Sequence, residues 1–140
     1  MKRDKWVWMP HAGHFIGGDY CHFRLSTYVG KYIVSTVGEL FWGDQVNRIK
    51  AEVYDKEWYA ENKSKLGDDF TRAYMKKFGY NEIGCGRKYE TMVFKAKKSD
   101  KCGACPYIML KATEIDFEGY NEAEEAFKGH YAMCNKWSKQ

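Results

Sequence analysis

Features that would place the protein in a membrane, secreted or repeat class are missing from the sequence. No apolar run approaches the ~20 residues that a bilayer-crossing helix needs, and the opening residues MKRDKWVWMPHAGH contain no apolar stretch of the signal-peptide type. There are only two prolines, no serine or glycine tract and no internal repeat, which argues against linkers and repeat arrays. We therefore expect a cytoplasmic protein with no membrane partner, folded as a single domain over residues 1–140.

The common catalytic signatures are also missing. The sequence has no Gly-x-Ser-x-Gly nucleophile elbow, no P-loop and no dinucleotide-binding fingerprint. The formal net charge is +4 and the pI is near 8.7, a mild excess that helps association with phosphates but also fits an ordinary solvated surface. Aromatic residues make up 17% of the chain and supply rings suited to a core or to stacking on a ligand. Composition therefore permits a nucleotide or nucleic-acid ligand without requiring one.

An alternating pattern predicts a β-hairpin in the segment CHFRLSTYVGKYIVSTVGEL. Strands are expected near 22–29 and 32–38, joined by Gly30 and Lys31 in a type II′ turn. If Val29 pairs with Tyr32, an apolar face and a polar face follow. The apolar face then holds Phe23, Leu25, Thr27, Val34 and Thr36, and the polar face holds His22, Arg24, Ser26, Tyr28 and Ser35. A short strand is expected ahead of the hairpin in KWVWM.

The remaining pattern predicts both helices and strands. Residues 47–54 fit either type and favour a strand, whereas residues 68–78 favour a helix that ends at Gly79. Two strand-like pieces follow, YNEIGCG and KYETMVFKA, and a further helix is expected after a cap at Asn121. The sequence thus predicts an α+β domain, a β-hairpin-rich mixed sheet with packed helices.

The segment YMKKFGYNEIGCGRKYETMVFKA resembles the closing helix and two strands of the general N-acetyltransferase family. In that family a helix ending in Lys-x-Gly-Phe leads into paired strands, and RIKAEVYDKEWYAEN stands where the family has the preceding strand, so the resemblance spans residues 47–96. It implies a splayed, partly parallel sheet and a site for acetyl-CoA. Two family features are missing: the pyrophosphate loop is not found between Val37 and Arg48, and Met75 stands where the family often has a tyrosine that acts as the general acid. The whole chain also resembles small phage-encoded proteins.

A second pattern predicts a structural zinc site in residues 100–140. CGAC supplies Cys102 and Cys105, and His130 and Cys134 follow at i and i+4 on the expected helix, which together match the tetrahedral ligand set of zinc. The five cysteines, which include Cys21 and Cys85, are an odd set that does not suggest a disulfide framework. Two other interpretations stay open: His130 and Cys134 belong to the core, or the cysteine pair is a redox dithiol.

A third pattern predicts a ligand site around the glycine-rich loop PHAGHFIGGDYCH. Its His11 and His14, with Cys21 and His22 nearby, suit metal binding or acid–base chemistry. Arg24, Arg87 and Tyr89 could complete an anion pocket through bidentate hydrogen bonds and stacking. Solvated loop histidines and exposed arginines are the alternative.

Two functions of different classes follow from these patterns. The first is a reduced acyl-CoA-dependent transferase, with its cleft near residues 47–54 and 80–94. The second is a non-enzymatic binding protein for nucleic acid or a nucleotide, with Arg24, Arg87 and Tyr89 arranged around a zinc-braced scaffold. The first predicts saturable binding of acetyl-CoA, and the second predicts salt-sensitive binding without turnover.

Overall fold

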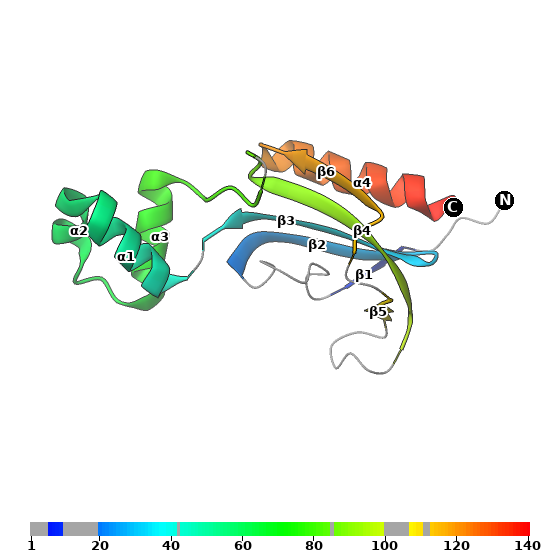
Figure 1. Ribbon diagram of the computed structural model, residues 1–140, viewed down its shortest axis with the longest axis horizontal. Helices are drawn as coiled ribbons and strands as arrows, with labels where there is room; N and C mark the ends of the chain where they lie inside the picture. The colour runs from blue at the N-terminus through cyan, green and yellow to red at the C-terminus, as the bar shows by residue number, and fades with distance from the viewer. Residues whose placement is uncertain (1–5, 10–19, 42, 85, 100–106, 111–112) are drawn as a thin grey trace.

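The computed structural model of the chain describes residues 6–9, 20–41, 43–84, 86–99, 107–110 and 113–140. These residues form a sheet, a long helix that lies along one face of the sheet, and a group of three helices at one end (Figure 1). The predicted α+β class is confirmed. No helix in the described part of the chain combines the length and the apolar content needed to cross a membrane.

The described sheet has six strands, and every pairing between them is antiparallel. The strands run in the order β1-β2-β3-β4-β5, and β6 also pairs with β4, along residues 89–93, whereas β5 pairs with residues 96–98. Their bounds are β1 Trp6–Trp8, β2 Cys21–Val29, β3 Tyr32–Leu40, β4 Tyr89–Lys98, β5 Tyr107–Met109 and β6 Asp116–Tyr120. The predicted mixed sheet is therefore wrong for the described strands, and the parallel pair implied by the acetyltransferase resemblance does not occur among them.

The predicted hairpin is confirmed as β2 and β3. Val29 pairs with Tyr32, so the turn consists of Gly30 and Lys31. Gly30 has a φ of 58°, the left-handed conformation that the first central residue of a type II′ turn requires and that glycine adopts without strain. The strand predicted in KWVWM is confirmed as β1, which pairs with β2 at its outer edge.

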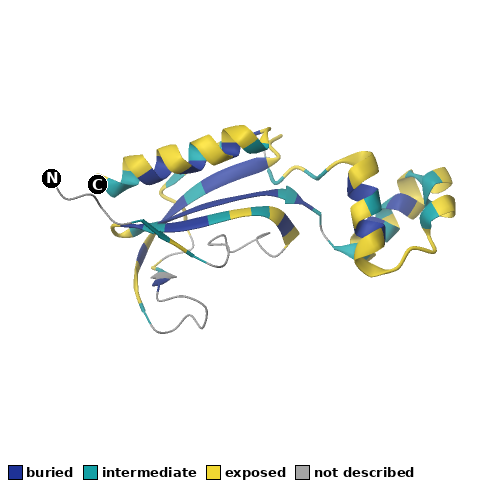
Figure 2. Ribbon diagram, turned by 180° about the vertical axis from the view of Figure 1, so that it is seen from behind, coloured by how far each residue is buried: buried dark blue, intermediate teal, exposed yellow. Residues whose placement is uncertain are grey.

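Helix α4, Ala123–Ser138, covers the face of the sheet that the sequence predicts to be apolar (Figures 1 and 2). The buried apolar residues where α4 meets β2, β3 and β4 are Val29, Val34, Val93, Met133 and Cys134. The helix itself is confirmed, but the predicted cap at Asn121 is wrong. The helix begins at Ala123 with Glu122 as its N-cap residue, because Glu122 is the last residue in an extended conformation.

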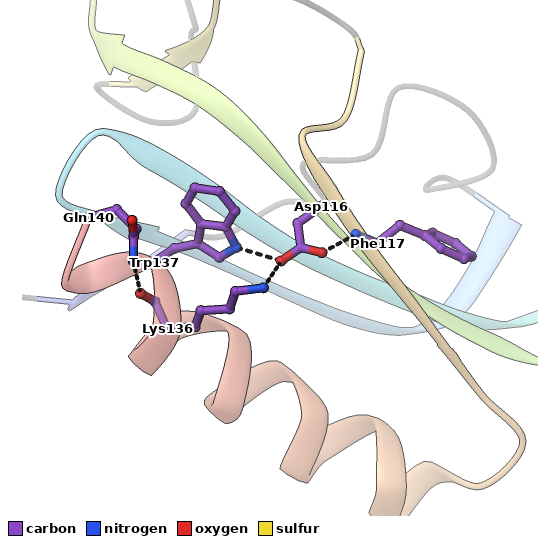
Figure 3. Close-up of polar contacts among 5 residues, drawn as sticks. All are labelled: Asp116, Phe117, Lys136, Trp137 and Gln140. Atoms are coloured by element: carbon purple, nitrogen blue, oxygen red, sulfur yellow. Dashed lines mark hydrogen bonds and ion pairs between the residues drawn. The ribbon is translucent and has the colours of Figure 1, made fainter.

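A hydrogen-bonded cluster joins the end of α4 to β6 (Figure 3). One carboxylate oxygen of Asp116 accepts hydrogen bonds from Lys136 Nζ at 2.8 Å and from Trp137 Nε1 at 2.9 Å. The other oxygen accepts from the backbone N–H of Phe117 at 2.8 Å. Burial of Asp116 opposes ionisation, but these three hydrogen bonds outweigh it and hold the pKa of the carboxyl below its usual value.

The opposite face of the hairpin is polar only in part, which corrects the prediction. His22 and Arg24 are exposed as expected, but Ser26 and Ser35 are buried. The difference arises because this face carries a second apolar cluster near the turn. Its buried members are Ile33, Ala96 and Tyr107, with Val7, Met9, Tyr28 and Met109 packed around them.

Three helices lie between β3 and β4 in the sequence and form what we call the helical unit. They are α1 Asp44–Tyr54, α2 Lys56–Asn62 and α3 Gly67–Phe78. The unit has a core of its own, built on Ala51, Phe70, Tyr74 and Met75, with Phe41, Trp58, Tyr59 and Tyr80 packed against it. It projects from one end of the sheet (Figures 1 and 2).

The strand predicted over residues 47–54 is wrong, because these residues belong to α1. The helix places Asn47 and Ala51, four residues apart, against the core of the helical unit. Asn47 Nδ2 then donates to the backbone carbonyl of Phe41 at 2.6 Å. Asp44 and Arg48 form an i,i+4 ion pair at 2.8 Å that a strand could not make. Long-range packing therefore determines the secondary structure of a segment whose local pattern fits both a helix and a strand.

The helix predicted over 68–78 is confirmed as α3, and it ends at Gly79 as expected, with a φ of 81°. The first of the two strands predicted after it is wrong. Residues 80–86 contain only the isolated bridges Leu40–Asn81 and Gly84–Arg87 among those described. The second strand is confirmed as β4.

Candidate binding site at the junction of sheet and helical unit

Aromatic and polar side chains meet where the helical unit joins the sheet. His22 comes from the start of β2, Phe41 follows β3, and Tyr80 follows α3. The imidazole of His22 lies over the ring of Phe41, with centroids 4.2 Å apart and planes 32° apart. Its Nδ1 is 3.1 Å from the hydroxyl of Tyr80. Tyr20 packs edge-on against Phe41, at 6.3 Å between centroids. We call His22, Phe41, Tyr80 and Tyr20, with Arg24, the junction site.

Glu39 stands beside the junction site in an unusual backbone conformation. Its φ of 57° is the only positive value at a non-glycine residue in the described chain, and such strain is typical of functional positions. The hydroxyl of Tyr89 donates to Glu39 Oε2 at 2.8 Å. Tyr89 reaches Glu39 by crossing Gly38, where a Cβ would overlap its ring. The missing side chain at Gly38 therefore allows the phenol and carboxylate to meet.

The phenols and the thiol near this site are held in their protonated forms. Burial, and then the charge of Glu39, raises the pKa of Tyr80. Burial and the hydrogen bond to Glu39 raise the pKa of Tyr89 strongly. Burial raises the pKa of the Cys21 thiol to about 11, although the nearby charge of Arg24 acts in the opposite direction. None of these three groups is therefore activated as a nucleophile by deprotonation at neutral pH.

The structure brings together some of the ligand residues predicted from the sequence and separates others. His22 and Arg24 are two residues apart on β2, so both lie on the face opposite α4. Tyr89 lies on the other face, paired with Gly38, and the side chain of Arg87 lies over Gly119 on β6. The expected pocket of Arg24, Arg87 and Tyr89 is therefore not assembled around one point. His11 and His14 lie outside the described residues.

The predicted zinc ligands are described only in part. Cys102 and Cys105 lie outside the described residues, and no group of three or more metal-binding side chains occurs among those described. His130 and Cys134 are both fully buried, on the side of α4 that faces the sheet. The predicted zinc site stays a prediction.

Both ring nitrogens of His130 have hydroxyl partners. Nε2 is 2.8 Å from Thr27 Oγ1, and Nδ1 is 2.7 Å from Thr36 Oγ1, which is itself 2.6 Å from Thr91 Oγ1. Burial lowers the pKa of His130 to about 4 and raises the pKa of Cys134 to about 12. A metal ion could use His130 only if one hydroxyl contact were broken, because each ring nitrogen is already occupied.

Comparison with protein-family models, with curated proteins and with solved structures gave no match for this chain. The resemblance to N-acetyltransferases therefore stays a prediction, as does the proposed acetyl-CoA site. The sequence reasoning missed Glu39, Phe41 and Tyr80 as members or neighbours of the site. Phe41 and Tyr80 lack a motif, and Tyr80 is 58 residues from His22, so only the folded chain brings them together.

Proposed function

We propose that this protein is a non-enzymatic module that binds a nucleotide unit, either free or within a single strand, at the junction site. The observation on which the proposal rests is the exposed imidazole of His22, which lies over Phe41 at 4.2 Å between ring centroids with a tilt of 32° and is hydrogen-bonded to Tyr80. A ring fixed on one side and exposed to solvent is a platform on which a base can stack at low entropic cost.

The position of Arg24 supports the same ligand class. It is exposed, lies two residues beyond His22 on the same face of β2, and makes no ion pair with another described residue. A guanidinium beside a stacking platform suits a phosphate attached to the stacked base, because it can donate two parallel hydrogen bonds to phosphate oxygens. The net charge of +4 is compatible with such a ligand.

Binding without catalysis is favoured by the protonation of the neighbouring groups. The phenols of Tyr80 and Tyr89 and the thiol of Cys21 all have raised pKa values. In these protonated forms they are weak nucleophiles and bases at neutral pH.

Fluorescence anisotropy with labelled single-stranded DNA and RNA, and calorimetry with mononucleotides, test this proposal. His22→Ala should weaken binding by about 5- to 150-fold, the loss of one stacked base. Arg24→Ala should weaken binding. It should also reduce the slope of log affinity against log salt concentration by about one, the contribution of a single phosphate contact. Arg72→Ala is the matched control, because Arg72 is an exposed arginine on α3 whose partner is Asp69.

Two results would overturn the proposal. If none of these ligands binds, or if His22→Ala and Arg72→Ala change affinity equally, the junction site is not the binding site. Acetyl-CoA separates the two predicted functions, since it contains a nucleotide but also a reactive thioester. Release of free CoA thiol in the presence of an amine acceptor would favour the transferase, whereas binding without thiol release favours the binding module.

A further inference from the structure

Helix α1 presents its apolar residues to solvent. Val46, Ile49 and Val53 lie at i, i+3 and i+7 and therefore share one face, which we call the apolar stripe. Their exposed fractions are 43%, 62% and 54%. The buried face of α1 holds Asn47 and Ala51 instead. An amphipathic helix normally buries its apolar stripe, whereas α1 exposes it. An apolar surface exposed in this way points to a contact with another molecule.

The rest of the helical unit does not use the apolar stripe. Its core is complete on the other side of α1, where Ala51 packs with Phe70 and the guanidinium of Arg48 lies 4.1 Å from the centre of the Phe70 ring. The unit also projects away from the sheet (Figure 2), and α4 lies over the sheet rather than over α1. The stripe is therefore open to another molecule.

We propose that the occupant is a second copy of the chain, with the two α1 helices antiparallel about a two-fold axis near Ile49. The stripe is nearly symmetrical about this residue, because Val46 precedes it by three positions and Val53 follows it by four. In an antiparallel pair Ile49 therefore meets Ile49 of the second copy, and Val46 meets Val53 of the second copy. Such self-complementarity is what an isologous contact requires.

The charges beside the stripe suit this arrangement. At 3.6 residues per turn, Gln45 and Glu52 lie along one edge of the stripe, and the antiparallel pair places Gln45 opposite Glu52 of the second copy, an amide facing a carboxylate. Lys50 lies along the other edge, but its Nζ donates to Asn81 Oδ1 at 2.7 Å, which directs it toward the junction. Asp44 and Arg48 neutralise each other. No like charges are forced together.

The stripe continues into an open hollow that gives room for the end of the second helix. This hollow of about 410 Å³ is lined by Val53, Tyr54, Trp58 and Phe78, together with Asp55, Lys56 and Glu57. Tyr54 and Phe78 are 79% and 41% exposed, so apolar surface extends past the helix end. A contact built on one helix per copy is smaller than a standard interface of about 800 Å² per partner. We therefore expect a weak dimer, with a dissociation constant between about 1 μM and about 1 mM.

Sedimentation equilibrium of the full chain over this concentration range tests the proposal. The wild type should shift from monomer to dimer, and Ile49→Glu should stay monomeric at every concentration with an unchanged circular dichroism spectrum. Leu66→Glu is the matched control, because Leu66 is 80% exposed outside α1 and this variant should still dimerise. The proposal is overturned if the wild type is still monomeric at about 1 mM, or if Ile49→Glu and Leu66→Glu lose dimerisation equally.

Cysteine cross-linking tests the antiparallel arrangement. A mixture of Val46→Cys and Val53→Cys chains should form a disulfide-linked heterodimer that neither variant forms alone and that wild type does not form. Like positions in an antiparallel pair lie about seven residues apart along the axis, roughly 10 Å at the helical rise, which is too far for a disulfide. Equal cross-linking of each variant with itself would indicate parallel helices and overturn the arrangement.

Discussion

Replacing Gly129 by alanine should destabilise the protein, although the usual rule for a helix interior predicts the opposite. Gly129 lies in the middle of α4, where alanine normally stabilises a helix by about 1 kcal/mol relative to glycine. Here a Cβ would overlap the hydroxyl, Cζ and Cε1 of Tyr120. Tyr120 is only 7% exposed and packs with Tyr89 and Ala126, so its rigid ring has little room to move.

The magnitude follows from these two opposing terms. Forcing extra atoms into a packed region typically costs about 1–3 kcal/mol, and the overlap with several ring atoms places Gly129→Ala toward the upper end. After subtraction of the helix-propensity gain, the free energy of unfolding should fall by about 1–2 kcal/mol. Urea unfolding followed by circular dichroism measures this change.

Two further variants separate packing from propensity. Ala132→Gly, at an exposed position of the same helix, should cost about 1 kcal/mol, the propensity term alone. In a Tyr120→Leu background the overlap disappears, so Gly129→Ala should then stabilise the protein. If Gly129→Ala stabilises the protein that retains Tyr120, the packing reasoning is wrong.

Three other predictions concern α4 and its neighbours. Because burial lowers the pKa of His130 from 6.5 to about 4, the unfolded chain binds a proton below pH 6.5 that the folded chain does not, so the free energy of unfolding should fall by about 3 kcal/mol as the pH drops from 6.5 to 4. Urea titrations with a chelator present should show that the free energy of unfolding changes less steeply with pH in His130→Gln than in wild type. If the two proteins give parallel profiles, the pH dependence does not come from His130. Asp116→Asn should lower stability by about 1–2 kcal/mol at pH 7, since charge-assisted hydrogen bonds from Lys136 and Trp137 are weakened, and wild type should approach the variant as the pH falls below 3.8. If the four ligands predicted from the sequence hold zinc, elemental analysis should find about one zinc per chain, and a chelator should lower the melting temperature; a zinc-free protein with full stability would return His130 and Cys134 to the core.

Local patterns predicted the elements whose partners are close in sequence. The hairpin of β2 and β3 follows from alternation and from Gly30, because both strands and the turn lie within one short segment. Helix α3 follows from its periodicity and from Gly79. Residues 47–54 could not be assigned in this way, because Ile49, Ala51 and Val53 fit either period and the deciding contact, Asn47 with the carbonyl of Phe41, depends on the fold.

The candidate site was less predictable than the fold. His22 and Arg24 were recognised as polar residues on one strand face, and the register confirms that shared face. The environment of His22 could not be foreseen, since Tyr80 reaches it from a segment that follows three helices. The role of Gly129 could not be foreseen either, because only the folded chain shows that the missing side chain leaves space for the ring of Tyr120.

The position of the helical unit has a consequence for how the chain folds. β3 and β4 are neighbours in the sheet, yet Glu39 and Tyr89, which meet at its end, are 50 residues apart in sequence. Pairing these strands from an unstructured chain requires closing that long loop, which costs entropy before any contact is gained. The helices between them have mostly local contacts and a separate core, so we expect them to form first. Once formed, they hold the two strand ends near each other, and the helical unit then acts as a preassembled connector that speeds closure of the sheet.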